Sequence, residues 1–286
     1  MRPFKWLSVW HNSRNNDAPF DTLPGSTRAR EEETTMADFI EGKRPIIEAL
    51  RTGVPIKRIL MADNVQRDGL IEDILRKAKR AEITVEFVPR RILDERSDRG
   101  SHQGVIAKAA PFPYVGIGDI IDASSHYAED HDGRALVVIL DHITDAGNLG
   151  AISRSAEAVG ACGLVIPNKR SAHVEASTYK SSAGAIAHVP VAQVSNLVQV
   201  IGRLKEEGFW IASATEHAED LIWNTNLKGK IALVMGNEQE GVSRLVLEKS
   251  DFLVKLPLEG EVASLNVAQA ATACMYEWLR QNAPTA

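Results

Sequence analysis

The sequence predicts an α/β protein with two parts, a small α/β domain over residues 37–110 and a parallel-sheet domain over residues 134–286. In both parts, short apolar runs alternate with longer stretches of helical periodicity, which is the pattern of strand–helix–strand units. The apolar runs of the second part are mainly aliphatic, as in strands that are buried on both faces. The predicted architecture of that part is therefore a doubly wound parallel sheet.

The small domain is predicted from its own alternation. Strands are expected at 56–61, 83–88 and 105–109. A helix is expected over 70–81, because its apolar residues recur every three or four positions and so share one face. Two further helices are expected, one that begins near Pro45 and ends at Gly53, and one that begins at Arg90.

The larger domain continues the alternation to the end of the chain. Strands are expected at 135–140, 164–166, 189–191, 209–214, 231–235 and 252–256. Helices are expected at 148–159, 197–207 and 266–281. Glycine follows the first two helices, at Gly160 and Gly208, as is typical of helix C-termini.

Two segments lack such periodicity. Residues 1–36 are rich in Asn, Asp, Arg, Ser, Thr and Glu and are expected to be a disordered N-terminal extension. Residues 111–133 begin with prolines and glycines, continue as an acidic stretch, and are expected to be a mobile linker.

The composition excludes several classes of protein. Hydrophobic residues make up 44% and charged residues 25% of the chain, and no run approaches the ~20 apolar residues of a membrane helix. Two cysteines, Cys162 and Cys274, cannot form a disulfide framework, and no Cys-x-x-Cys pair accompanies them. We therefore expect a cytoplasmic protein with no membrane segment and no metal ion.

The charge is distributed unevenly. The net charge of the whole chain is −5, but residues 37–115 carry 15 basic and 12 acidic side chains. Residues 134–286 carry 13 basic and 16 acidic side chains. A local excess of positive charge matters more for binding phosphate than the total does, so the small domain is the part with the charge better suited to binding phosphate.

Two loops of the larger domain carry polar side chains directly after predicted strands. The strand at 231–235 runs into Gly236-Asn-Glu-Gln-Glu-Gly241, and the strand at 252–256 is followed by Gly260-Glu-Val-Ala-Ser-Leu-Asn266. In open α/β sheets, ligands bind beyond the carboxyl ends of the strands. Taken alone, each loop would be an ordinary connection between a strand and a helix.

Together with an upstream segment, the two loops resemble the three signature motifs of the SpoU/TrmH family. The upstream segment is Asp141-His-Ile-Thr-Asp-Ala-Gly-Asn-Leu-Gly-Ala-Ile-Ser-Arg-Ser-Ala156. Its one departure is Ala146, where the family usually has a proline that only stiffens the turn. Gly42-Lys-Arg44, Glu48-Ala-Leu50 and His102-Gln-Gly-Val105 are similar to the substrate-binding domain of many members.

The resemblance implies a function and a fold feature that no periodicity could indicate. Family members transfer a methyl group from S-adenosylmethionine to a ribose 2′-hydroxyl of RNA, and their catalytic domain ends in a deep trefoil knot. A guanosine of 23S rRNA is the expected target, and tRNA is the alternative. A non-catalytic RNA-binding protein with the same fold is a further alternative.

The resemblance also implies the site residues. The catalytic candidates are Arg154, Asn148, Glu238, Ser264 and Asn266. Arg154 is expected to act as a cation that holds a phosphate and stabilises the developing alkoxide, because a guanidinium is almost always protonated. The alternatives are a surface arginine, a helix cap for Asn148, Ser264 or Asn266, and a solvated carboxylate for Glu238.

The adenosyl pocket is expected around Gly236, Leu256 and Leu265. Gly236 would leave room for the ligand, and the leucines would supply an apolar wall with their main-chain groups facing the adenine edge. Without the motifs, both leucines would be read as core residues.

Two other predictions follow from the sequence. A dinucleotide-dependent oxidoreductase is disfavoured because no Gly-x-Gly-x-x-Gly follows a predicted strand. The last helix has an apolar arc that spans more than half its circumference, so we expect a homodimer through this helix, with Met275 and Trp278 in the interface. Packing of the whole arc inside one subunit is the alternative.

Overall fold

The computed structural model describes residues 39–97, 102–261 and 264–283. The extension predicted over residues 1–36 lies outside them. The described residues form a four-stranded mixed sheet and a seven-stranded parallel sheet, which confirms the predicted α/β class. No helix in these three ranges is both long and apolar enough to cross a membrane.

The small sheet has the strand order β1-β4-β2-β3. Its strands are β1 Phe39–Glu41, β2 Ile56–Ala62, β3 Thr84–Val88 and β4 Val105–Ala109, and its helices are α2 Lys43–Thr52, α3 Gly69–Arg80 and α4 Arg90–Asp94. β2 pairs in parallel with β3 and antiparallel with β4. The three-residue edge strand β1 was not predicted, because three residues are too few to show a period.

The large sheet has the order β7-β6-β5-β10-β8-β11-β9, and every pairing in it is parallel. The strands are β5 Ala135–Asp141, β6 Gly163–Pro167, β7 Val191–Val194, β8 Trp210–Ala214, β9 Asp220–Leu221, β10 Lys230–Gly236 and β11 Phe252–Lys255. Five of the six predicted strands are confirmed, the strand predicted at 189–191 lies instead at Val191–Val194, and β9 is an additional two-residue strand at the edge.

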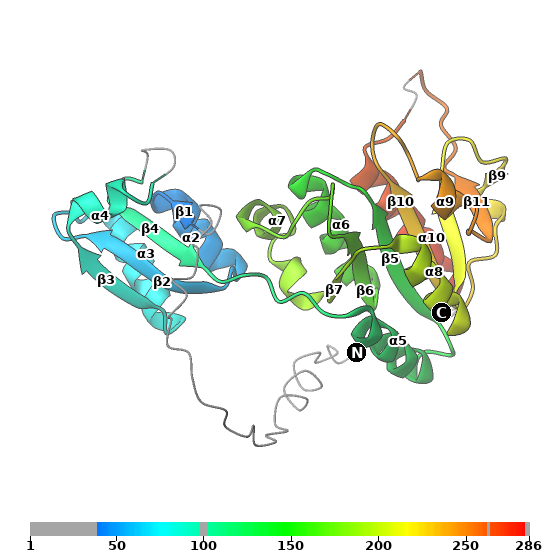
Figure 1. Ribbon diagram of the computed structural model, residues 1–286, viewed down its shortest axis with the longest axis horizontal. Helices are drawn as coiled ribbons and strands as arrows, with labels where there is room; N and C mark the ends of the chain where they lie inside the picture. Colours follow the sequence, from blue (N-terminus) through cyan, green and yellow to red (C-terminus); the bar gives the residue numbers. More distant parts are fainter. Residues whose placement is uncertain (1–38, 98–101, 262–263, 284–286) are drawn as a thin grey trace, which may run out of the picture. The chain divides into compact units, whose positions relative to one another are not determined.

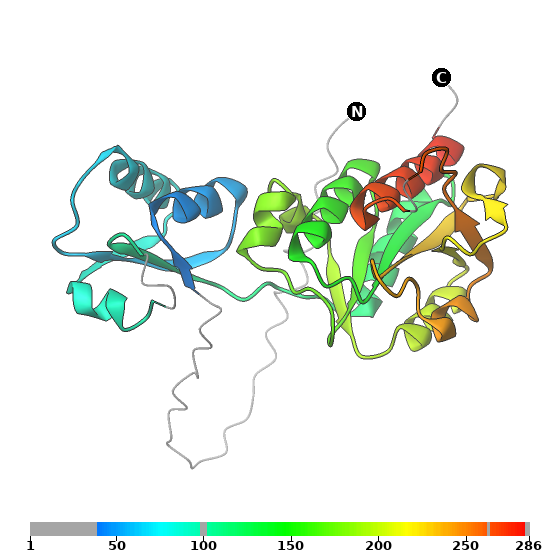
Figure 2. The ribbon, with the colours of Figure 1, turned by 90° about the horizontal axis from the view of Figure 1, so that it is seen from above.

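Helices cover both faces of this sheet (Figures 1 and 2). They are α5 Ile117–Asp130, α6 Ala146–Val159, α7 Ala176–Ser181, α8 Leu197–Glu206, α9 Arg244–Leu247 and α10 Val267–Asn282, with 3-10 turns at Ala185–His188 and Ile222–Asn224. Along β5, Leu136 and Val138 join the core under α6 and α10, whereas Val137 and Ile139 join the core under α5 and α8. Successive side chains point to opposite faces, so a strand covered on both faces is apolar throughout.

The prediction of a linker over 111–133 is wrong for most of its length. α5 occupies Ile117–Asp130 and packs on the sheet with Ile120, Ile121 and Ala128 buried. The signal was present as apolar residues at helical spacing, but the four acidic residues and one glycine within the helix obscured it.

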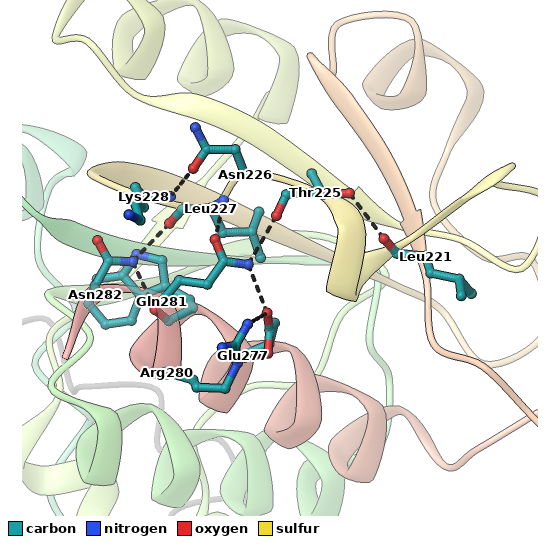
Figure 3. Close-up of polar contacts among 10 residues, drawn as sticks. Leu221, Thr225, Asn226, Leu227, Lys228, Glu277, Arg280, Gln281 and Asn282 are labelled. Atoms are coloured by element: carbon teal, nitrogen blue, oxygen red, sulfur yellow. Dashed lines mark hydrogen bonds and ion pairs between the residues drawn. The ribbon is translucent and has the colours of Figure 1, made fainter. Parts of the chain in front are cut away.

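The prediction that Met275 and Trp278 lie in a dimer interface is also wrong. Met275 is 0% exposed and Trp278 1% exposed within one chain, where they pack between α10 and the sheet. At the end of α10, Gln281 and Asn282 bind the main chain of the loop before β10, and Glu277 pairs with Arg280 (Figure 3). The alternative of packing inside one subunit therefore holds for this part of the arc. The trefoil knot stays a prediction of the family resemblance.

Strand order locates the expected ligand crevice. From β5 the chain proceeds outward through β6 to β7, and it then returns to build β8, β10 and β11 on the other side. The direction of winding therefore reverses between β5 and β10, and the crevice beyond their carboxyl ends is the preferred ligand site in such sheets. Two of the sequence motifs occupy the loops that leave these two strands.

Candidate active site

The three sequence motifs meet at this crevice through three side chains. The Asn148 side-chain amide donates a hydrogen bond to Glu238 Oε1 at 2.6 Å. Asn266 Nδ2 donates to Asn148 Oδ1 at 3.0 Å. Asn148, Glu238 and Asn266, which we call the polar triad, come from α6, the loop after β10 and the start of α10.

Asn148 is free to join the triad because another residue caps its helix. The Asp145 carboxylate accepts the hydrogen bond from the Asn148 main-chain N–H at 2.6 Å and is the N-cap of α6. The alternative of a capping role for Asn148 is therefore wrong. Asn266, by contrast, caps α10 through the N–H of Ala268 and contacts Asn148 at the same time.

The loop that carries Glu238 is held in place by its neighbours. Asn237 pairs with Gly241 across the loop, at 3.0 and 2.9 Å, and its side chain donates to the His142 carbonyl at 2.8 Å. The buried Asp141 carboxylate accepts from the Ser243 N–H at 2.7 Å and binds the His142 ring at 2.6 Å. The roles of Asn237 and Asp141 were not predicted, although a carboxylate at the end of an apolar strand is a usable signal.

Gly236 is required for a reason different from the expected one. A Cβ at this position would lie 2.2 Å from the Gly241 carbonyl carbon and 2.2 Å from the Val242 nitrogen. The space beside Gly236 is therefore filled by the chain itself. The glycine allows the loop 236–242 to close on β10, and its place in the adenosyl pocket stays a prediction.

Arg154 and Ser264 do not join the polar triad. Arg154 is exposed on α6, and its side chain makes no hydrogen bond or ion pair with any residue that the structure describes. It lies six residues beyond Asn148, which is about 9 Å along the helix and about 240° around it. Ser264 is exposed in the segment before α10.

The two predicted cofactor leucines lie on the connection between β11 and α10. Leu256 follows β11 and packs partly against the core under α10, whereas Leu265 precedes α10 and is 44% exposed. An exposed leucine side chain is suited to the apolar face of an adenosyl group. The residues present therefore fit such a cofactor.

A separate cavity of about 290 Å³ lies at the carboxyl end of β7 and is lined by Gln193, Asn196 and Arg203 among others. None of the predicted site residues lines it. The polar triad and not this cavity marks the candidate site, because only the triad brings the three motifs together.

The two cysteines are excluded from the chemistry. Cys162 is 0% exposed and Cys274 1% exposed. Burial raises the pKa of the Cys162 thiol to about 11 and that of Cys274 to about 12. Both therefore stay protonated at neutral pH, whereas the thiolate is the nucleophilic and metal-binding form.

Sequence comparisons connect this geometry to known proteins. The model of the SpoU rRNA Methylase family matches residues 135–276, and a model described as RNA 2′-O ribose methyltransferase substrate binding matches residues 39–115. A Bacillus subtilis protein that bears the name TrmH family tRNA/rRNA methyltransferase YacO is 39% identical over 86% of this chain and 97% of its own length. A similarly named Staphylococcus aureus protein is 38% identical over 85% of this chain and 95% of its own.

Structure comparison gives the same result. The SpoU methyltransferase AviRb from Streptomyces viridochromogenes, in complex with AdoMet, is similar with a TM-score of 0.65 and 26% identity. The similarity covers 85% of this chain and 89% of AviRb. The AdoMet-bound rRNA methyltransferase from Sinorhizobium meliloti shares the fold, with a TM-score of 0.61 and 23% identity.

Proposed function

Since this chain belongs to the SpoU methylase family of RNA methyltransferases, we propose that it transfers a methyl group from S-adenosylmethionine to the ribose 2′-hydroxyl of a guanosine in 23S rRNA. The observation that carries the proposal is the polar triad, in which one side chain from each motif meets at the crevice between β5 and β10. We propose the cytoplasm as the place of this reaction.

The polar triad is suited to positioning the ribose. An amide NH₂ has two donors, and Asn148 uses one of them on Glu238. Its oxygen is engaged by Asn266, so the orientation of the amide is fixed and its second N–H is available to a ribose oxygen. When bound, S-adenosylmethionine supplies an electrophilic methyl group. Holding the 2′-oxygen in line with that methyl group removes much of the entropic cost of the reaction.

Arg154 is the proposed cation for the alkoxide that develops as the 2′-hydroxyl loses its proton. A guanidinium cannot serve as the base at neutral pH, but it stabilises negative charge and binds phosphate. Because Arg154 points away from the triad of its own chain, we propose a homodimer in which each subunit's Arg154 serves its partner's site. The exposed part of α10, which includes Tyr276, belongs to the proposed interface.

Residues 39–115 are the proposed RNA-binding part. The support is the substrate-binding family match over this segment and its excess of basic side chains. With residues 134–286 as the catalytic part, we propose that the first part selects a structured RNA and the second modifies it. A tRNA substrate is the second candidate, because the names of the relatives include both RNAs.

The test is transfer of tritiated methyl from S-adenosylmethionine to unmodified transcripts of 23S rRNA and of tRNAs, followed by mapping of 2′-O-methyl positions. We expect Arg154→Ala to lower the turnover number by about a thousandfold, or ~4 kcal/mol, while calorimetry shows cofactor affinity within a few fold of wild type. Lys228→Ala, which removes an exposed cation before β10, is the matched control and should retain full activity.

The outcomes separate the parts of the proposal. Methylation of tRNA alone would refute the rRNA assignment. Loss of cofactor binding in Arg154→Ala would place this residue in the cofactor pocket. If Arg154→Ala and an inactive Asn148→Ala variant, mixed, fail to recover activity, each site draws Arg154 from its own chain.

A further inference from the structure

We propose that the loop formed by residues 168–171, here called the basic loop, binds RNA phosphate next to the target nucleotide; this rests on the proposed function. The loop follows β6 and carries Lys169 and Arg170. Both side chains are exposed, and neither makes a hydrogen bond or ion pair with another part of the described structure. None of the predicted site residues lies in this loop.

The basic loop is fixed by hydrogen bonds on both sides of its cations. The Asn168 N–H donates to the Val194 carbonyl at 2.8 Å. The Ser171 hydroxyl and the Ala172 N–H both donate to the Ile143 carbonyl, at 3.2 and 2.7 Å. Two cations without a partner among the described residues thus extend from an ordered main chain, so binding a ligand costs little ordering of the backbone.

Arg170 is held in a backbone conformation that arginine rarely adopts. Its φ is +53°, in the left-handed region where a Cβ is unfavourable. The flanking bonds to Ile143 and Val194 compensate for this local cost. Strained residues of this kind gather at ligand-binding positions, where the surrounding structure holds them.

The basic loop lies beyond the carboxyl ends of the strands, on the side of the sheet where the polar triad lies. β6, β5 and β10 are consecutive neighbours, and their parallel carboxyl ends place the basic loop, the first-motif loop and the Glu238 loop side by side. Neighbouring strands are about 4.8 Å apart, so the basic loop lies roughly 10 Å from the Glu238 loop. This separation suits a phosphate that flanks a ribose bound at the triad.

Three carboxylates on neighbouring segments accept hydrogen bonds from groups other than the two cations. Asp145 accepts the N–H of Asn148, Glu238 accepts the Asn148 amide, and Glu175 accepts the Ser177 hydroxyl. None of the three pairs with Lys169 or Arg170 among the described residues. The cations therefore keep their charge available for an anion, and phosphate is the anion that the RNA supplies.

The experiment compares the double variant Lys169→Ala/Arg170→Ala with wild type, using the unmodified RNA transcript that wild type methylates best. We expect the Michaelis constant for RNA to rise about tenfold or more, since hydrogen bonds between a cation and a phosphate are stronger than those between neutral groups. The slope of log affinity against log salt should fall in magnitude by roughly 0.7 for each lost contact with single-stranded RNA. Cofactor affinity and thermal stability should stay at wild-type values.

The matched control is Lys228→Ala/Lys249→Ala. These two exposed lysines precede β10 and β11 and so lie at the amino ends of the strands, opposite to the basic loop. Their removal lowers the net charge by the same amount but should leave the Michaelis constant and the salt slope unchanged.

Equal effects of the two double variants would overturn the inference, because general charge and not the basic loop would then be responsible. An unchanged Michaelis constant and salt slope in Lys169→Ala/Arg170→Ala would also overturn it. If wild type methylates no RNA, the proposed function itself fails. An active wild type with an unaffected loop variant refutes only the role of the loop.

Discussion

Replacing Gly236 with alanine separates two explanations for a glycine at the end of β10. If the glycine leaves room for a cofactor, a methyl group there should weaken binding and leave the fold intact. In the structure the added Cβ would lie 2.2 Å from main-chain atoms of Gly241 and Val242. Main-chain atoms cannot rotate away as a side chain can, so the loop would have to move by more than 1 Å.

The size of the effect follows from the bonds that such a shift disturbs. Asn237 and Gly241 exchange two main-chain hydrogen bonds of 3.0 and 2.9 Å, and Ser243 donates to Asp141 at 2.7 Å. At about 0.5–1.5 kcal/mol for a neutral hydrogen bond and somewhat more for one to a carboxylate, their partial loss amounts to ~2–4 kcal/mol. That corresponds to a fall of about 5–15 °C in the melting temperature of a chain of this size.

Thermal unfolding and isothermal calorimetry with S-adenosylmethionine measure the two quantities separately. Gly241→Ala is the matched control, because Gly241 has a φ of +70° but open space around its Cβ position. It should cost only the backbone strain, about 1 kcal/mol. A Gly236→Ala protein that melts like wild type but binds the cofactor tenfold more weakly would refute the loop-closure explanation.

Three further outcomes are expected. Gln281→Ala should lower the free energy of unfolding by about 1–3 kcal/mol in urea titration, because the Leu227 N–H and the Thr225 carbonyl lose their partner (Figure 3). A change no larger than about 0.5 kcal/mol would show that water replaces the Gln281 side chain as their partner. Gly202→Ala should raise the melting temperature by a few degrees, since this position of α8 has a free Cβ site and alanine is the better helix former; a decrease would reveal a hidden contact. Burial raises the pKa of the two thiols from the ordinary value of 9.0 to about 11 for Cys162 and about 12 for Cys274. The stability that they contribute is therefore fully present below pH 9 and should be lost as the pH rises toward 11–12. In serine variants that remove both thiols, the free energy of unfolding should fall less over this alkaline range.

Local periodicity and the three motifs were enough to predict most strands and helices and the family. The aliphatic run 135–140 predicted a strand buried on both faces because alternate side chains enter two cores, and the structure shows Leu136 and Val137 doing so. Helix ends at Gly160 and Gly208 followed from the left-handed conformation that glycine adopts there, with φ values of +74° and +83°. The three motifs identified the candidate site residues, since a motif consists of side-chain types at short, fixed spacings that can be read directly from the sequence.

Which of those residues come into contact depends on packing between elements that are distant in the sequence. Asn148 and Asn266 are 118 positions apart, and their contact depends on the packing of α10 against α6, which no local period specifies. The same non-local packing turned part of the expected linker into α5, buried Met275 and Trp278 inside one chain, and filled the space beside Gly236 with main chain. Periodicity reports how apolar a face is, but burial against a neighbouring element and burial against a second subunit leave the same pattern, because both remove the face from water.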